Sequence, residues 1–213
     1  MEITKLEHSG FALTKNHETI LIDPVEFTEK LPTHLFSEVI AIIITHKHDD
    51  HCQPGVISNI LASNSAATIF TTPDASPLIS GSIVVRPDET RQVGSFKIQF
   101  FGKSHASIVE GQIPCDNLGV IIDDLFANPG DSFDTPPLEH PKVLCVPVSA
   151  PWAKISDAAK YIKDVHPEIV IPVHDAVLSN LGKTYSLSWL KYTCDPLGIK
   201  FAPLTPASTI TIE

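Results

Sequence analysis

The chain has 213 residues, of which 43% are hydrophobic, and its formal net charge at pH 7 is −10. This length and apolar content can bury one large core, and no linker-like stretch divides the chain, so we expect a single domain over residues 1–213. The negative charge argues against polyanionic partners such as nucleic acids. The absence of a long apolar run or a signal peptide predicts a cytoplasmic protein without a membrane partner.

Strand-like and helix-like segments alternate along the chain. Apolar, β-branched or alternating stretches predict strands over residues 3–6, 11–14, 19–22, 39–44, 68–71, 83–85, 96–101, 118–122, 125–127, 143–146, 169–173 and 208–212. Helical spacing of apolar residues predicts helices over residues 54–62, 155–165 and 187–196. The strands at 118–122 and 125–127 are expected to form a hairpin that turns at Asp123 and Asp124. This alternation predicts a layered α/β architecture.

The densest group of potential ligands lies at residues 46–51, which read His-Lys-His-Asp-Asp-His. The group follows the apolar run at 39–44, which is typical of a strand buried on both faces, and precedes Pro54, which suits the first turn of a helix. It therefore forms a strand-to-helix loop, where a rigid scaffold can present side chains. A solvated polar turn is the alternative interpretation, but this density of imidazoles and carboxylates favours a metal site.

The spacing within this loop suits two ions. Imidazole nitrogen and carboxylate oxygen are ligands that zinc and similar divalent ions favour. His46 and His48 are two residues apart in an extended stretch, so both can point to one ion, while Asp50 and His51 can reach a second. A single ion would leave half of these ligands unused.

Three further candidates follow predicted strands later in the chain. His105 comes after the strand at 96–101, Asp131 follows the hairpin, and His174 closes the strand at 169–173. Each alone has an ordinary explanation, as a hydrogen-bonded histidine or as a turn residue. All three lie at the C-terminal ends of strands, the edge where open α/β sheets place their ligands, so we expect them to join the loop at residues 46–51.

These motifs together, from His-x-His-x-Asp-His at residues 46–51 to Pro-Val-His at residues 172–174, resemble the metal-ligand set of the metallo-β-lactamase fold superfamily. The Leu-Ile-Asp-Pro of residues 21–24 is similar to the family's early strand, which ends in an aspartate, here Asp23. The resemblance covers nearly the whole chain and implies a four-layer αββα sandwich, with two mixed sheets flanked by helices. The short length and the His-Ser-Gly-Phe of residues 8–11 also resemble the branch of compact hydrolases related to L-ascorbate-6-phosphate lactonase.

The resemblance implies seven metal ligands, three for a first ion, three for a second, and one that bridges both. In that order they are His46, His48 and His105; Asp50, His51 and His174; and Asp131. Asp23 would orient a ligand imidazole by accepting its hydrogen bond, and Asp50 would also act in catalysis by steering the proton of the attacking water. Zinc is the expected metal for both positions, with manganese or iron as alternatives.

Two cations that share a water molecule lower its pKa and stabilise charge on the attacking and leaving oxygens. We therefore expect a dinuclear metal-dependent hydrolase whose metal-bridging hydroxide attacks a small-molecule ester, lactone or phosphodiester. One alternative is an iron-dependent oxidoreductase on the same fold, and another is a metal-binding module without activity. The imidazole of His48 favours hydrolysis over the first alternative, because diiron relatives tend to carry a carboxylate in the motif, and the complete ligand set argues against the second.

Three residues are candidates for the substrate pocket. Trp152 precedes a predicted helix and either forms an aromatic wall of the pocket or packs under that helix. Lys183 and Tyr185 follow His174 in the sequence and are candidates for contact with a phosphate or carboxylate. His8 is expected to be structural, and the four cysteines, which form no CxxC pair, are expected to be free thiols. A homo-oligomer is compatible with the sequence.

Overall fold

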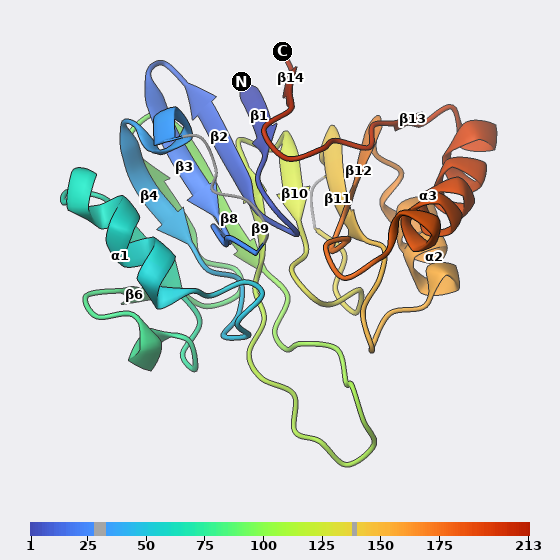
Figure 1. Ribbon diagram of the computed structural model, residues 1–213, viewed down its shortest axis with the longest axis horizontal. Coiled ribbons are helices and arrows are strands. Elements are labelled where there is room, and N and C mark those ends of the chain that lie inside the picture. Colours follow the sequence, from blue (N-terminus) through green and yellow to red (C-terminus); the bar gives the residue numbers. More distant parts are fainter. Residues whose placement is uncertain (28–32, 138–139) are drawn as a thin grey trace.

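Two mixed β-sheets lie side by side with helices on their outer faces (Figure 1). This computed structural model describes residues 1–27, 33–137 and 140–213, and within them each sheet has seven strands. The two ends of the chain lie close together because the last strand pairs with the first (Figure 1).

The first sheet contains the N-terminal strands and the C-terminal strand. Its spatial order is β14 (Thr209–Thr211), β1 (Glu2–Lys5), β2 (Phe11–Lys15), β3 (Glu18–Ile22), β4 (Val39–Ile43), β5 (Thr68–Thr71) and β6 (Ile83–Val84). The three pairings from β14 to β3 are antiparallel, and the three from β3 to β6 are parallel. β3 and β4 are buried almost throughout, which agrees with their nearly continuous apolar sequences.

The second sheet repeats this plan. Its spatial order is β7 (Thr90–Val93), β8 (Phe96–Phe101), β9 (Gly119–Ile122), β10 (Phe126–Asn128), β11 (Val143–Pro147), β12 (Ile169–Val173) and β13 (Lys200–Phe201). Three antiparallel pairings from β7 to β10 are again followed by three parallel pairings from β10 to β13. The two sheets thus share one topology, although the amino-acid sequence shows no internal repeat.

Hydrophobic cores fill the spaces between the layers. The central core lies between the two sheets, where the rings of Phe11 and Phe126 meet with their centroids 5.2 Å apart. Helix α1 (Pro54–Ser63) buries Ile57 and Ile60 in the core beneath it, against the first sheet. Helices α2 (Ile155–Val165) and α3 (Asn180–Cys194) cover the second sheet (Figure 1). The αββα sandwich expected from the sequence is therefore confirmed.

Short 3₁₀ helices connect some of these elements: η1 (Thr33–Phe36), η2 (Ser76–Leu78) and η3 (Asp195–Leu197). None of the helices in the described part of the chain has the length and apolar content needed to cross a membrane.

Some elements differ from the prediction. Helix α3 begins at Asn180 and not at the predicted residue 187, because Ser179 Oγ accepts a hydrogen bond from the Gly182 N–H (3.2 Å) and caps the helix earlier. Strand β7 was not predicted because its sequence, Thr-Arg-Gln-Val, is short and polar and lies at a sheet edge. Strand β13 has two residues, too few to produce a periodic pattern.

The predicted hairpin turn at Asp123 and Asp124 is confirmed. Both residues have positive φ, 54° and 59°, and the Leu125 N–H donates to the Ile122 carbonyl oxygen (2.9 Å), which closes the turn. Phe126 pairs with Ile122 across the turn. Aspartate tolerates this backbone region better than most residues with a Cβ, so the pair of acids is compatible with the turn.

Candidate metal centre

The loops that carry the predicted ligands meet at one edge of the two sheets. The loop at residues 46–51 follows β4, His105 follows β8, Asp131 follows β10, and His174 directly follows β12. Five of the seven predicted ligands are buried, while His48 and Asp50 are partly exposed. The structure brings all seven side chains into one cluster.

One part of the cluster consists of three imidazoles, those of His46, His48 and His105. One nitrogen from each ring lies within 4.8 Å of the others. The ring centroids of His48 and His105 are 4.6 Å apart, and those of His46 and His48 are 4.8 Å apart. The long loop between β8 and β9 presents His105, whose N–H donates to the Cys115 carbonyl oxygen (2.8 Å). Three imidazoles at this spacing can ligate one ion.

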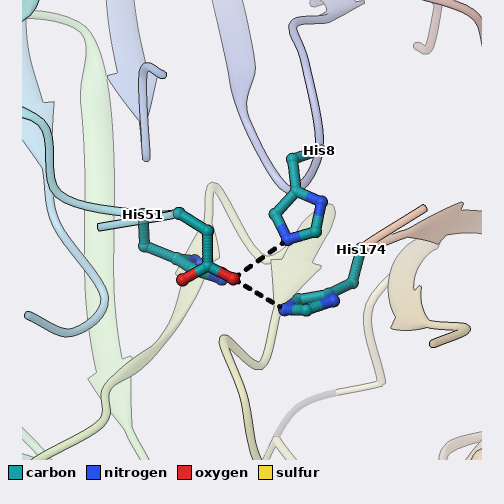
Figure 2. A group of neighbouring side chains, drawn as sticks. His8, His51 and His174 are labelled. Atoms are coloured by element: carbon teal, nitrogen blue, oxygen red, sulfur yellow. Dashed lines mark ion pairs between the residues drawn. The ribbon is translucent and has the colours of Figure 1, made fainter. Parts of the chain in front are cut away.

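The second part of the cluster contains Asp50, His51 and His174 together with His8, and their ligand atoms also lie within 4.8 Å of one another. Asp50 Oδ2 lies 3.4 Å from His174 Nε2 and 3.3 Å from His8 Nε2 (Figure 2). Burial lowers the pKa of His8 to about 4. The sequence suggested a structural role for His8, whereas the structure places its ring against the Asp50 carboxylate.

Asp131 reaches both parts of the cluster. Its Oδ1 lies 3.3 Å from His51 Nε2, and its Oδ2 lies 3.4 Å from His105 Nε2 and 3.0 Å from His174 Nε2. The Asp131 carboxylate therefore lies close to one ring of the first part of the cluster, that of His105, and to two rings of the second part, those of His51 and His174.

The backbone of Asp131 is held by Asn117, a residue that the sequence analysis did not single out. Asn117 Oδ1 accepts the Asp131 N–H (2.9 Å), and Asn117 Nδ2 donates to the Pro129 carbonyl oxygen (2.9 Å). Gly130, between them, has a φ of 62°, and a Cβ at this position would lie 2.3 Å from Asn117 Oδ1. Only glycine therefore fits this turn. No local motif marks Asn117, because its partners follow it by a dozen residues or more.

Hydrogen bonds determine which ring nitrogen faces the centre. Nδ1 of His105 donates to the carbonyl oxygen of the next residue, and Nδ1 of His174 donates to the Ser149 carbonyl oxygen, each at 2.5 Å. Nδ1 of His51 lies 2.7 Å from Asp23 Oδ2. In all three rings an acceptor holds the Nδ1 proton, so Nε2 is the nitrogen that faces the centre and that can ligate a metal once it gives up any proton of its own.

Asp23 holds the loop at residues 46–51 in place through hydrogen bonds to Thr45 and His51. Its buried carboxylate accepts hydrogen bonds from the Thr45 N–H (2.8 Å) and the Thr45 Oγ1–H (2.7 Å) in addition to the His51 ring. Thr45 Oγ1 also lies 3.1 Å from His46 Nδ1, and because its own proton goes to Asp23, it accepts the proton of that ring. Asp23 thus orients His51 directly and His46 through Thr45.

Carboxylates and imidazoles in the cluster compensate each other's charge. Burial alone would lower the pKa of His51, but Asp131 and Asp23 raise it well above its ordinary value. Burial also opposes protonation of His174, yet Asp131 and Asp50 raise its pKa to about 9. Burial would raise the pKa of Asp131, but His51 and His174 hold it well below its usual range. Protons on these rings occupy the electrostatic role that a bound cation would take over.

Five buried atoms at the centre have no hydrogen-bond partner: Nε2 of His8, His46, His51 and His174, and Oδ1 of Asp131. An unpaired buried polar atom costs about 1–3 kcal/mol, so such a concentration indicates a site that binds something. Imidazole nitrogen and carboxylate oxygen suit zinc and similar divalent ions. The residues present therefore fit a metal centre.

A family model described as "Beta-lactamase superfamily domain" matches residues 2–174. The chain belongs to this superfamily. Protein Rv0786c of Mycobacterium tuberculosis is 29% identical to it over 189 residues, which cover 84% of this chain and 86% of the relative. The finer resemblance to relatives of L-ascorbate-6-phosphate lactonase stays a prediction.

Solved structures share the fold of this superfamily member. Igni18, described as a novel metallo hydrolase from the hyperthermophilic archaeon Ignicoccus hospitalis, matches with a TM-score of 0.73 and 21% identity over 100% of this chain and 98% of its own. CmlA, a diiron β-hydroxylase from Streptomyces venezuelae, matches with a TM-score of 0.71 and 13% identity over 99% of this chain and 54% of its own. At these identities the likeness establishes the metallo-β-lactamase fold, which both a hydrolase and a hydroxylase use.

Trp152 lies next to the candidate metal centre. Its Nε1–H donates to Asp131 Oδ2 (3.0 Å), and its ring meets Phe133 edge-to-face with centroids 5.2 Å apart. The sequence suggested either a pocket wall or packing under a helix. The hydrogen bond to Asp131 was missed because the two residues are 21 positions apart and no local pattern links them.

Lys183 and Tyr185, the other predicted pocket residues, lie on α3. Lys183 Nζ is 2.9 Å from Oδ2 of Asp175, the residue that follows His174 in the sequence. The side chain of Tyr185 is mostly exposed. Contact of either residue with a phosphate or carboxylate stays a prediction.

All four cysteines are free, as expected. Cys52, which adjoins the histidine motif, belongs to the hydrophobic core beneath α1. Cys115 is the thiol near the imidazoles, with its Sγ 3.7 Å from His48 Nε2. Burial raises the pKa of Cys115 to about 11, so near neutral pH this thiol is a protonated neighbour of His48 and not a reactive thiolate.

Proposed function

We propose that this chain is a hydrolase that depends on two divalent ions. The observation that carries the proposal is the buried Asp131 carboxylate, which reaches ring nitrogens of both imidazole groups. The proposed ligands are His46, His48 and His105 for the first ion, Asp50, His51 and His174 for the second, and Asp131 between them. Zinc is the proposed metal because this set of nitrogen and oxygen donors suits it, with manganese or iron as alternatives.

Ions held at such a centre activate water and stabilise charge on the attacking and leaving oxygens. The protein directs the Nε2 lone pairs of His51, His105 and His174 to the centre by binding their Nδ1 protons. The Asp50 side chain is 33% exposed, whereas that of Asp131 is 3% exposed. Asp50 can therefore exchange a proton with solvent, and we assign to it the proton of the attacking water.

The proposed substrate is a small-molecule ester, lactone or phosphodiester. The formal net charge of −10 disfavours attraction to nucleic acids. Trp152 offers an aromatic surface beside the centre, which suits a small organic substrate. The free thiols are compatible with the proposed cytoplasmic location.

Metal quantitation combined with a substrate panel tests this proposal. Protein stripped by a chelator is reloaded separately with zinc, manganese and iron, and is assayed on phosphodiesters, lactones, thioesters and β-lactams. We expect hydrolysis of at least one class, rising until both metal positions are filled. Bound metal without any turnover would support a non-catalytic metal-binding module, and a strongly coloured iron form that oxidises its substrate would support an iron-dependent oxidoreductase.

A further inference from the structure

We propose that His8 is a positioning residue that holds the Asp50 carboxylate in place for the second ion by donating its Nε2–H. This inference rests on the proposed dinuclear function, because it gives Asp50 a supporting partner at that centre. It also separates His8 from the neighbouring imidazoles, which present a lone pair to the centre.

The turn between β1 and β2 places His8 at the cluster. Leu6 N–H donates to the Gly10 carbonyl oxygen, and Gly10 N–H donates to the Glu7 carbonyl oxygen, both at 2.8 Å, while His8 itself has a φ of 55°. The His8 carbonyl oxygen accepts the His174 N–H (3.2 Å). The backbone of His8 is thus attached to the strand end that carries a ligand of the second group.

Buried Lys5 secures the same turn. Its ammonium group donates to the carbonyl oxygens of Leu6 and His8 and lies 4.0 Å from Asp175 Oδ1. A lysine is rarely buried without such partners, and here they come from the turn and from the residue after His174. The position of the His8 ring is therefore determined by backbone contacts that do not depend on its side chain.

The contacts of the two ring nitrogens determine the tautomer of His8. The Ala176 N–H points to His8 Nδ1 at 3.3 Å, so Nδ1 must offer a lone pair. A ring with a lone pair on Nδ1 carries its proton on Nε2. This is the reverse of His51, His105 and His174, in which Nδ1 faces an acceptor and Nε2 is the nitrogen left to bind a cation.

The Nε2–H of His8 has one suitable acceptor in the cluster. Nε2 is buried without an aligned hydrogen-bond partner and lies 3.3 Å from Asp50 Oδ2 (Figure 2). The His8 side chain has no exposed surface, and its ring lies 3.9 Å from the His174 ring and 5.5 Å from the Phe27 ring, centroid to centroid. Asp50 is partly exposed, so a small rotation of its carboxylate aligns it with this fixed donor.

A role for His8 as a further metal ligand is less consistent with these contacts. Ligation through Nε2 would move the ring proton to Nδ1, which would then face the Ala176 N–H, donor against donor, at 3.3 Å. Ligation would thus lose the hydrogen bond from Ala176 and leave two donors opposed in a buried place, which is unfavourable. The donor role satisfies both ring nitrogens.

Histidine-selective ¹⁵N NMR on the metal-free wild-type protein tests the tautomer. We expect the His8 ring to carry its proton on Nε2, with the signal assigned by its loss in His8→Gln. A proton on Nδ1 would overturn the proposal. This readout involves neither metal nor substrate.

Metal affinity tests the positioning role. We expect His8→Ala to bind the second ion about 10- to 100-fold more weakly than the wild type, the usual effect of losing a residue that supports a ligand. His8→Gln, whose amide N–H can still donate to Asp50, should recover most of this affinity, and the exposed His34→Ala serves as the matched control. If His8→Ala fails to fold, His8→Asn replaces it, because its amide is too short to reach Asp50.

Two results would contradict the positioning role. One is wild-type affinity in His8→Ala, and the other is a His8→Gln variant as weak as His8→Ala, which would indicate ligation or packing. Neither readout uses a substrate, so a lack of hydrolysis by the wild-type protein would count against the proposed function and leave the result for His8 standing.

Discussion

Each of the two sheets contains a hairpin that is followed by a buried aspartate. In the first sheet the β2–β3 hairpin turns through residues 16–17, and β3 is followed by Asp23; in the second the β9–β10 hairpin turns through residues 123–124, and β10 is followed by Asp131. All four turn residues have positive φ. Both aspartates are buried. Equivalent places in the repeated topology therefore carry the same type of side chain.

The two aspartates differ in what their surroundings donate to them. Asp23 receives a backbone N–H and a hydroxyl from Thr45 and the Nδ1 side of His51. Asp131 receives the Trp152 indole N–H and faces imidazole Nε2 atoms, and its Oδ1 has no hydrogen-bond partner. His51 lies between them, with one ring nitrogen on each. The aspartate that follows the fourth strand of each sheet is thus an orienting carboxylate where hydrogen-bond donors fill its acceptor positions and a candidate metal bridge where they do not.

Replacing Asp131 should have the largest effect in this comparison. We expect Asp131→Ala to lose metal-dependent turnover by more than the roughly 100-fold that removal of a supporting residue can cost, because a shared ligand is gone. Its far-UV circular dichroism should stay close to that of the wild type. The exposed Asp134→Ala is the matched control, and unchanged turnover in Asp131→Ala would count directly against the centre.

Replacing the equivalent Asp23 should weaken metal binding without abolishing it. We expect Asp23→Ala to lower metal affinity by about 10- to 100-fold, because the His51 ring loses the acceptor that orients it. The two unpaired Thr45 donors should also lower the free energy of unfolding by about 1–3 kcal/mol each. Calorimetric titration with zinc and urea unfolding measure the two effects. If Asp23→Ala were as damaging as Asp131→Ala, the distinction between the two aspartates would be lost.

Removing the indole donor should have a smaller effect. We expect Trp152→Phe to lower kcat/KM by about tenfold, since a hydrogen bond to a charged group contributes about 1.5 kcal/mol at the lower end of its range. The ring that faces Phe133 is kept in this variant. Trp189→Phe, at an exposed position on α3, is the control. Identical kinetics in both variants would show that the indole N–H of Trp152 does not support Asp131.

The pH dependence of stability should reveal the charge pairing at Asp131. The pKa of His174 is raised from 6.5 to about 9 in the folded protein. The stability that this group contributes to the metal-free protein is therefore fully present below pH 6.5 and is lost as the pH rises through about 9. Urea unfolding of the metal-free protein across this range should show the decline, and His174→Gln should reduce it. A decline of equal size in His174→Gln would assign it to other groups.

Local patterns in the sequence were enough to predict which strand ends present the candidate ligands. The apolar run before residue 46 produces a buried strand, and strand C-termini in such sheets share one edge, so His105, Asp131 and His174 could be expected beside the loop at residues 46–51. Asn117 and the turn that presents His8 gave no comparable signal, because their partners lie far away in the sequence. Strands β7 and β13 were missed because they are short and lie at sheet edges.

The sequence by itself determined the chemistry available to this protein, since the identity and density of imidazoles and carboxylates at strand ends depend on local patterns alone. The tertiary structure decided how each group is used. A ring nitrogen becomes a lone pair or a donor according to the partner of its other nitrogen, and those partners, such as Asp23 for His51 and the Ala176 N–H for His8, come from other strands and loops. Only folding brings them within hydrogen-bonding distance.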